Sequence, residues 1–179
     1  GEDRYYHLVL LAENNQGYAN LMKIVSKGFT EGFYYKPRVD MAVLKEYHEG
    51  IIALSACLAG EVARYLQRGM YEDAKAAALR YQDIFGEGNF FLELQDHGIP
   101  AQQVVNQELL RMHEETGIDL VATNDVHYTK AEDAAPHDIL LCLQTNKKLA
   151  DEDRMRYEGG QYYVKSPEEM AQLFPYALE

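Results

Sequence analysis

Asp125 and His127 are the two residues whose types and spacing most clearly suggest chemistry in this sequence. They lie in the run VATNDVHY, directly after the apolar segment DLVATN. In an extended segment, residues i and i+2 project to the same side, so a carboxylate oxygen and an imidazole nitrogen can converge on one ion. This combination of ligands suits zinc, manganese or iron. The alternative is that Asp125 caps the following helix and that His127 lies on the surface.

Three further residues stand where a ligand could lie. His7 is inside the apolar run YYHLVLLAE, and the alternative for it is a hydrogen-bonded core residue. Cys57 follows IIALSA, where a thiolate could approach an ion, and the alternative is a small buried hydrophobic residue. His97 follows NFFLELQD, but the turn DHGIP offers it an equally good structural role.

Other reactive side chains give weaker signals. Lys36 and Arg38, in YYKPRVD, form a basic pair beside aromatic residues; they could meet a phosphate, or they could belong to a solvated loop. Cys142 fits the inner face of a helix and is expected in the core. His48, His113 and His137 fall on predicted helices without a partner at ligand spacing, so we expect them to be solvated.

Composition and charge limit the class of protein. The formal net charge of −12 argues against a chain that grips DNA through its phosphates by itself. No apolar run approaches the roughly 20 residues of a membrane span, and the start of the sequence does not resemble a secretory signal. Two cysteines do not make a disulfide framework, so a cytoplasmic location is expected.

The elements that would position these residues alternate between strands and helices. Apolar strands are expected over 5–13, 51–55, 89–96 and 119–124, with a possible short edge over 161–164. Helices are expected between them and over SPEEMAQLF, where Ser166 and Glu169 form a capping box. This order predicts an α/β fold with a largely parallel sheet, in which ligands bind at the carboxyl ends of the strands. A closed eight-stranded barrel needs about 250 residues, which suggests a small open domain or a piece of a barrel.

Five blocks in order carry a family resemblance: HLVLLAENNQGYANLMKIVS, GFYYKPRVD, GIIALSACLAGEV, FFLELQDHG and VATNDVHY. Together they resemble the PHP (polymerase and histidinol phosphatase) domain of the bacterial replicative DNA polymerase III alpha subunit. The resemblance runs from about Tyr5 to the C-terminus. It implies a partial PHP domain over 1–165, followed over 166–179 by a C-terminal helix leading toward the polymerase palm.

The resemblance also implies a fold and a metal site. The fold would be an incomplete, distorted (β/α)7 barrel of the PHP type, with divalent metal ions, zinc or manganese, at the carboxyl ends of its strands. Magnesium would serve the polymerase elsewhere in the chain. The positions that match family ligands are His7, Cys57, Asp125 and His127, whereas His97 does not match one.

One departure from the family is large. The opening section of the family, with an HxH strand, an Asp-His turn and a glutamate after a cysteine, is missing from this sequence. We interpret the chain as the C-terminal two-thirds of a PHP domain from a longer polymerase. Two-metal phosphoester hydrolysis needs two ions about 4 Å apart, and four ligands can fill one site at most, so we expect little or no nuclease activity from this piece alone. We expect no polymerase activity from it, because the catalytic carboxylates of the palm would lie beyond Glu179.

Three functions therefore remain as hypotheses. The first is a metal-binding phosphoesterase-like module of a DNA-replicating nucleotidyltransferase, linked to 3′–5′ proofreading in the intact chain. The second is a non-catalytic module that braces the polymerase or docks a partner, and the third is a stand-alone PHP phosphatase. The expected partners are the remainder of the polymerase chain, other replicase subunits including a proofreading subunit, and DNA in the intact protein only, with no membrane.

Overall fold

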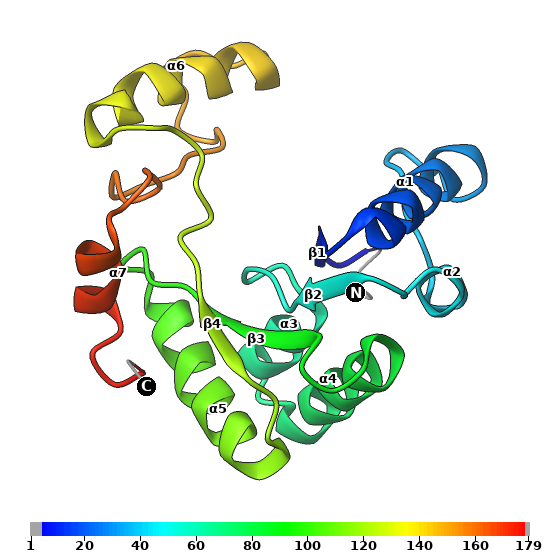
Figure 1. The fold of residues 1–179 in the computed structure, drawn as a ribbon. Helices are drawn as coiled ribbons and strands as arrows, with labels where there is room; N and C mark the ends of the chain where they lie inside the picture. The colour runs from blue at the N-terminus through cyan, green and yellow to red at the C-terminus, as the bar shows by residue number, and fades with distance from the viewer. Residues whose placement is uncertain (1–4, 178–179) are drawn as a thin grey trace. The chain divides into compact units, whose positions relative to one another are not determined.

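A four-stranded sheet organises the chain in the computed structural model, which describes residues 5–177. Its strands are β1 (Val9–Ala12), β2 (Ile51–Leu54), β3 (Phe90–Leu94) and β4 (Leu120–Ala122), in the order β1-β2-β3-β4 (Figure 1). β2 and β3 run parallel, with Ala53 opposite Phe90. Strands alternate with helices along the chain, and the sheet is open, with β1 and β4 at its edges. The predicted α/β class is confirmed.

Strand β1 differs from the expected parallel arrangement because it runs antiparallel to β2. Val9 lies opposite Leu54, and Ala12 lies opposite Ile51. The amide of Glu13 donates to the carbonyl of Gly50 at 2.9 Å, so β2 begins beside the residue at which β1 ends. A strand that begins there can pair with β1 only in the opposite direction. The apolar pattern of a strand carries no information about this direction.

Some of the helices begin where the sequence offers capping side chains. Asn14 accepts the amide of Gly17 at the start of α1 (Asn15–Thr30), and Asp40 accepts the amide of Val43 at the start of α2 (Met41–Glu46). The predicted capping box of Ser166 and Glu169 opens α7 (Pro167–Leu173). The remaining helices are α3 (Glu61–Gln67), α4 (Tyr71–Phe85), α5 (Pro100–Thr116), the short 3-10 helix η1 (Ala131–Asp133) and α6 (Ala134–Thr145).

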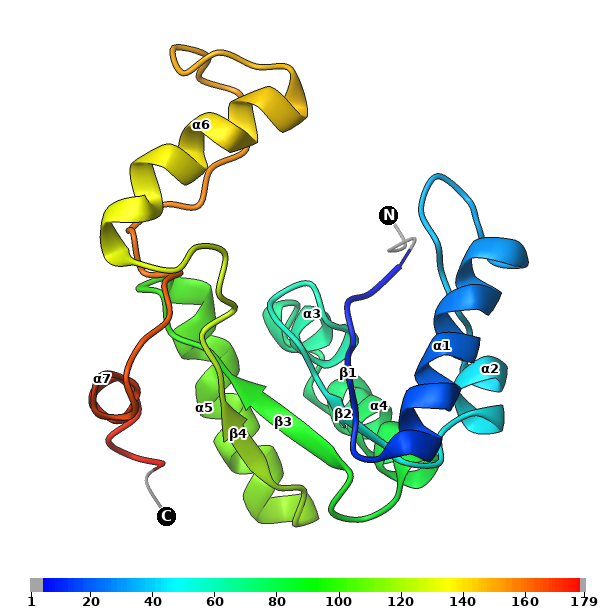
Figure 2. The ribbon, with the colours of Figure 1, turned by 45° about the horizontal axis from the view of Figure 1, so that its top comes forward.

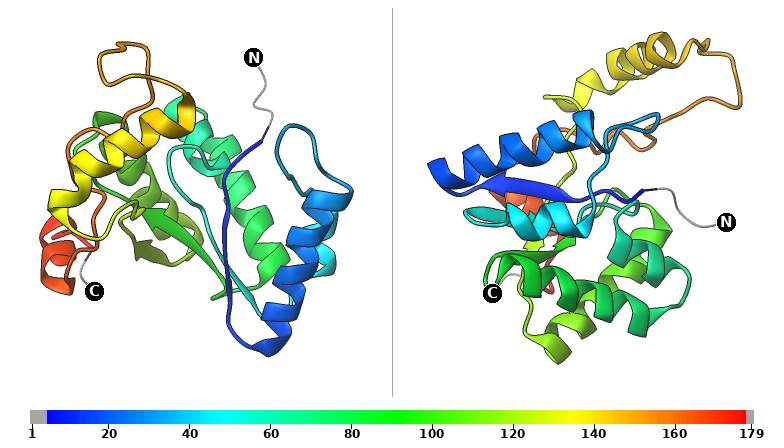
Figure 3. Two further views of the ribbon diagram at one scale, coloured as in Figure 1. Left: turned by 90° about the horizontal axis from the view of Figure 1, so that it is seen from above. Right: turned by 90° about the vertical axis from the view of Figure 1, so that its right-hand side faces the viewer.

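The chain forms two compact units. The first runs through Leu94 and includes Val104–Val121, and its core lies where α4 packs on β2 and β3 (Figure 2). Its α1 packs on β1 and β2 (Figure 3). The second unit comprises Gln95–Gln103 and the chain from Ala122 onward, and it contains α6 and α7. No helix in the described part of the chain is long and apolar enough to cross a membrane.

The proposed division into 1–165 and 166–179 stays a prediction. Its second segment contains α7, and residues 1–4 and 178–179 at the two ends fall outside the described residues.

Two glycines of α1 predict opposite responses to alanine. A Cβ at Gly17 would lie 1.8 Å from the Gly50 carbonyl oxygen, whereas one at Gly28 would meet nothing closer than 3.4 Å. We expect Gly17→Ala to lower the free energy of unfolding by about 1–3 kcal/mol or more, because backbone must move. Gly28→Ala should raise it by up to about 1 kcal/mol through helix propensity. Urea denaturation followed by circular dichroism measures both, and equal midpoints would contradict the packing of α1 against Gly50.

Candidate metal centre

A tight turn after β2 brings Cys57 to His7. Ala56 has a left-handed backbone with φ 66°, and a Cβ at Gly60 would lie 2.1 Å from the Ser55 carbonyl oxygen. The amide of His7 donates to the Ala59 carbonyl at 3.1 Å, which joins this turn to the segment before β1. As a result, Cys57 Sγ lies 3.5 Å from His7 Nδ1. Residues far apart in the sequence thus present a sulfur and a nitrogen side by side.

The surroundings of this first pair suit ligands better than core residues. His7 is exposed and Cys57 is half-buried and not part of a disulfide, so the core alternatives for both are wrong. Two ligands bound tetrahedrally to zinc at its usual nitrogen and sulfur distances lie about 3.5 Å from each other. The separation of Sγ and Nδ1 fits that geometry without a backbone movement.

A second pair follows β4. Asp125 Oδ1 lies 3.5 Å from His127 Nε2, and the two side chains are 39% and 28% exposed. Asp125 does not cap the next helix, because the N-cap positions of η1 and α6 are Lys130 and Asp133. That alternative for Asp125 is therefore wrong. A carboxylate oxygen and an imidazole nitrogen at this separation also match two ligands of one ion.

Asn124 holds the backbone on which the second pair stands. Asp125 has φ 42°, a left-handed conformation that costs a non-glycine residue about 1 kcal/mol. The buried Asn124 amide donates to the carbonyls of Gln161 and Tyr163 at 2.8 and 2.7 Å. Its oxygen accepts from Lys165 Nζ at 3.3 Å, and burial lowers the pKa of Lys165. These bonds offset the strain at Asp125.

His97, which the sequence left ambiguous, has a structural role in the same unit. It is buried, and its ring stacks on Tyr162 with centroids 3.9 Å apart. Its Nε2 donates to the Asn124 carbonyl at 2.8 Å. Gln102 accepts the His97 amide at 2.7 Å through its oxygen, so its nitrogen faces His97 Nδ1 at 2.8 Å and donates to it. The ring is therefore neutral, and burial lowers the pKa of His97.

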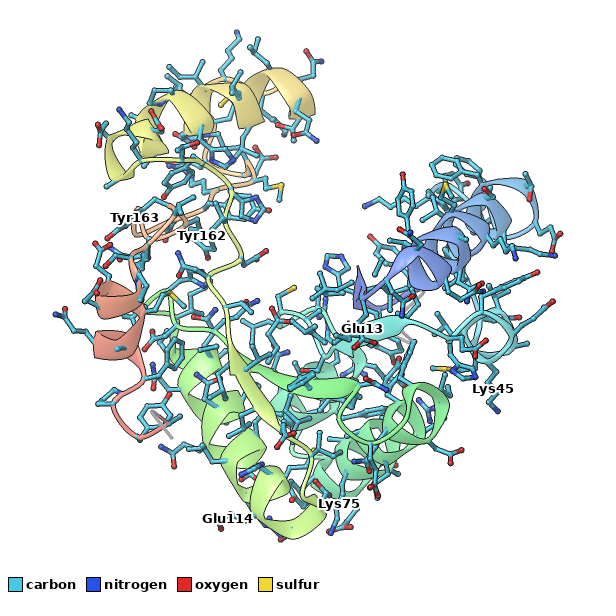
Figure 4. The ribbon with its side chains drawn as sticks, in the orientation of Figure 1. Glu13, Lys45, Lys75, Glu114, Tyr162 and Tyr163 are labelled. Carbon is cyan, nitrogen blue, oxygen red and sulfur yellow. The ribbon has the colours of Figure 1, made fainter. Side chains whose placement is uncertain are left out.

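Aromatic rings surround His127. The ring centroids of Tyr157, Tyr162 and His137 lie 4.1, 5.6 and 5.9 Å from that of His127. Figure 4 shows Tyr162 and its neighbour Tyr163 on the segment that links α6 to α7. Residues 161–164, a possible edge strand by sequence, form no strand; the Tyr162 carbonyl instead accepts the amides of His127 and Tyr128.

Sequence reasoning missed this ring cluster. His137 was expected to be solvated but is half-buried against Tyr128 and Tyr157. His113 is also half-buried, with Nδ1 2.6 Å from the Ile118 carbonyl oxygen. The contact of His137 with Tyr157 has no signature in local spacing, because Tyr157 lies in a loop after α6. Cys142 is buried, as expected.

Each pair brings two side chains of ligand type within 3.5 Å of each other. Among residues 5–177, no group of three or more His, Cys, Asp or Glu side chains lies close enough together to hold a metal ion. The sulfur and nitrogen donors of the first pair are types that zinc binds, and the oxygen and nitrogen donors of the second pair are types that zinc and manganese both bind.

Comparison with known proteins gives a family and close relatives. Residues 1–97 match the PHP domain family. The chain is 48% identical to the DNA polymerase III subunit alpha of Deinococcus radiodurans, over 98% of this chain and 13% of that protein. It is 47% identical to the protein of the same name from Treponema pallidum, over 98% of this chain and 15% of the relative. For that of Thermus aquaticus, the identity is 43% over 97% of this chain and 14% of the relative.

The neutral state of His97 predicts a pH dependence. Its pKa in the folded chain is below the usual value of about 6.5, so the unfolded chain takes up the proton first as pH falls. Its contribution to stability is full above about pH 6.5 and is lost as pH falls toward the folded pKa. We expect the free energy of unfolding of His97→Gln to fall less between about pH 7.5 and 5 than that of the wild type. Denaturation series at several pH values measure this, and parallel curves would contradict it.

Proposed function

This chain belongs to the PHP domain family, and we propose that it is the metal-binding, phosphoesterase-like module of a DNA polymerase III alpha subunit. The support is an identity of 43–48% with relatives of that name over nearly all of this chain. The chain spans only about 13–15% of the length of those relatives. DNA-directed DNA polymerase activity, DNA replication and any 3′–5′ proofreading are thus proposed for a whole protein of this kind.

The observation that carries the proposal is the geometry of the two ligand pairs. We assign His7 and Cys57 as one pair of metal ligands and Asp125 and His127 as the other. Each pair has its donor atoms 3.5 Å apart, on side chains that solvent reaches. Zinc or manganese is the metal we propose, because nitrogen, sulfur and carboxylate donors are combined.

The residues of the chain have defined tasks in this proposal. A bound divalent ion supplies a Lewis acid that polarises a phosphoryl oxygen and lowers the pKa of water. Cys57 must lose its proton to bind the ion, and His7 and His127 must be neutral at the nitrogens that face their partners. Asn124 fixes the backbone beside Asp125, which keeps the carboxylate oriented before a metal arrives.

A non-catalytic bracing or docking module is the second candidate. It is favoured by the absence of a three-ligand group among the residues that the structure describes. The third hypothesis, a stand-alone phosphatase, has less support because the named relatives are all polymerase subunits.

For both the catalytic and the bracing module, the proposed partners are the rest of the polymerase chain, other replicase subunits including a proofreading one, and DNA in the intact protein. Magnesium would serve the polymerase site elsewhere.

Cobalt substitution tests the ligand assignment directly. The chain loaded with Co²⁺ should show a thiolate-to-cobalt absorption band, because Cys57 would bind as the thiolate. We expect Cys57→Ser to lose the band and Cys142→Ser, which removes a buried core thiol, to keep it. Elemental analysis should show reduced metal content for Asp125→Asn as well. A band that persists in Cys57→Ser would rule out the proposed sulfur ligand.

A nuclease assay tests whether this chain is catalytic by itself. We expect the metal-loaded chain to release little or no nucleotide from single-stranded DNA, since two-metal hydrolysis needs two ions bridged about 4 Å apart. Clear turnover that Asp125→Asn abolishes would contradict this expectation and favour a catalytic module. Asp83→Asn, a change of a carboxylate in α4 that belongs to neither pair, is the matched control.

A further inference from the structure

The loop between α1 and α2 and Tyr5, which precedes β1, form an exposed group of aromatic and basic side chains that the metal proposal does not use. We define the aromatic–basic cluster as Tyr5, Tyr34, Tyr35, Lys36 and Arg38. Lys36 Nζ lies 5.2 Å from the centroid of the Tyr5 ring and donates to its hydroxyl at 3.2 Å. The Arg38 guanidinium lies 4.9 Å from the Tyr34 ring and donates to the Tyr34 carbonyl. The cations thus organise the rings.

Tyr35 is presented to solvent at an energetic cost. Its side chain is 79% exposed and its φ is 61°, in the left-handed region that a bulky residue rarely adopts. Its ring makes an edge contact with Tyr34, at 4.7 Å between centroids. Because the Tyr35 side chain is largely exposed, burial of its ring does not offset this backbone strain, and packing does not explain why the residue is a tyrosine. Strain of this kind concentrates at functional sites.

The base of the loop is closed tightly, so the cluster is held in place. A Cβ at Gly32 would lie 1.9 Å from the Arg38 carbonyl oxygen, which means that the two ends of the loop touch. Pro37 and Val39 lie against Gly28 of α1, and Asp40 caps α2 directly afterwards. Binding to a pre-organised loop costs less conformational entropy than binding to a flexible one.

The cluster offers the two kinds of contact that a single strand of nucleic acid needs. Lys36 forms no ion pair among residues 5–177, although the chain as a whole carries a net charge of −12. A cation without a carboxylate partner in an acidic chain is available to a phosphate. Exposed tyrosine rings give faces on which bases stack, whatever their sequence.

The cluster also adjoins the first ligand pair. The ring of Tyr5 stacks on that of His7, with centroids 6.3 Å apart, and His7 is the partner of Cys57. A nucleotide held by Lys36 and Tyr35 would therefore lie beside the proposed ligands in the same unit.

We propose that the aromatic–basic cluster binds a nucleotide unit of single-stranded DNA, with Lys36 on a phosphate and Tyr35 stacked on a base. Tyr34 supports the Tyr35 ring through their edge contact. Arg38 braces Tyr34. The proposal deepens, and rests on, the assignment of the chain as a phosphoesterase-like module.

Fluorescence anisotropy with a labelled oligothymidylate at low salt tests the site. EDTA is present, so metal binding does not contribute to the anisotropy. The metal-ligand assignment is tested separately, by cobalt absorption. We expect Tyr35→Gly to weaken binding about tenfold. Glycine suits φ 61°, so the melting temperature should stay equal or rise, which separates lost binding from lost folding. Lys36→Ala should weaken binding and reduce the slope of log K against log salt by about 0.7.

Two control variants outside the cluster remove the same kinds of side chain, a lysine and a tyrosine. Lys23→Ala removes an exposed cation that lies 5.5 Å from the Tyr47 ring, and Tyr18→Ala removes an exposed ring of α1. Both should bind the oligonucleotide as the wild type does. The proposal is overturned if the wild type does not bind, if the controls weaken binding as much as the cluster variants, or if inorganic phosphate at equal concentration displaces the oligonucleotide.

Discussion

Strand β2 is the constraint on which the first unit depends, because it is paired along both edges. It pairs with β1 on one side and β3 on the other, and Ala53 at its centre is fully buried. Both α1 and α4 pack against it. Because β2 begins beside Gly50, at the end of β1, the two strands pair in opposite directions. The turn that contains Cys57 follows the end of β2. A shift of β2 by one residue would turn its buried side chains outward and remove Cys57 from His7.

Backbone strain marks the places where the strands end near proposed ligands. Ala56 after β2 and Asp125 after β4 both have positive φ. Each is held by its surroundings, the first by the close approach of Gly60 to Ser55 and the second by the hydrogen bonds of Asn124. Local strain of about 1 kcal/mol at each position is sustained because neighbouring bonds over-determine the conformation. The same logic applies to Tyr35, whose loop is closed by Gly32.

Buried polar side chains whose atoms are all hydrogen-bonded stabilise the fold of this chain and are not candidates for metal ligands. His97 lies at a strand end, where a ligand would be expected, yet both its ring nitrogens are satisfied by Asn124 and Gln102. Glu61 is another case, since it is buried with bonds from Arg80 and Tyr81. Position in the fold was thus insufficient to separate ligands from structural residues. The donor atoms of the two proposed ligand pairs differ from those of His97 in lying 3.5 Å from another side-chain atom of ligand type, on side chains that solvent reaches.

The sequence by itself determined the elements and the chemistry of the candidate residues. The capping box of Ser166 and Glu169 and the α/β class follow from capping and periodicity, which act over a few residues. Only the tertiary structure decided the antiparallel direction of β1, the approach of Cys57 to His7, the ring cluster around His127 and the buried bonds of His97. These depend on contacts between segments distant in sequence, whose geometry is set by packing and by backbone turns that local patterns do not encode.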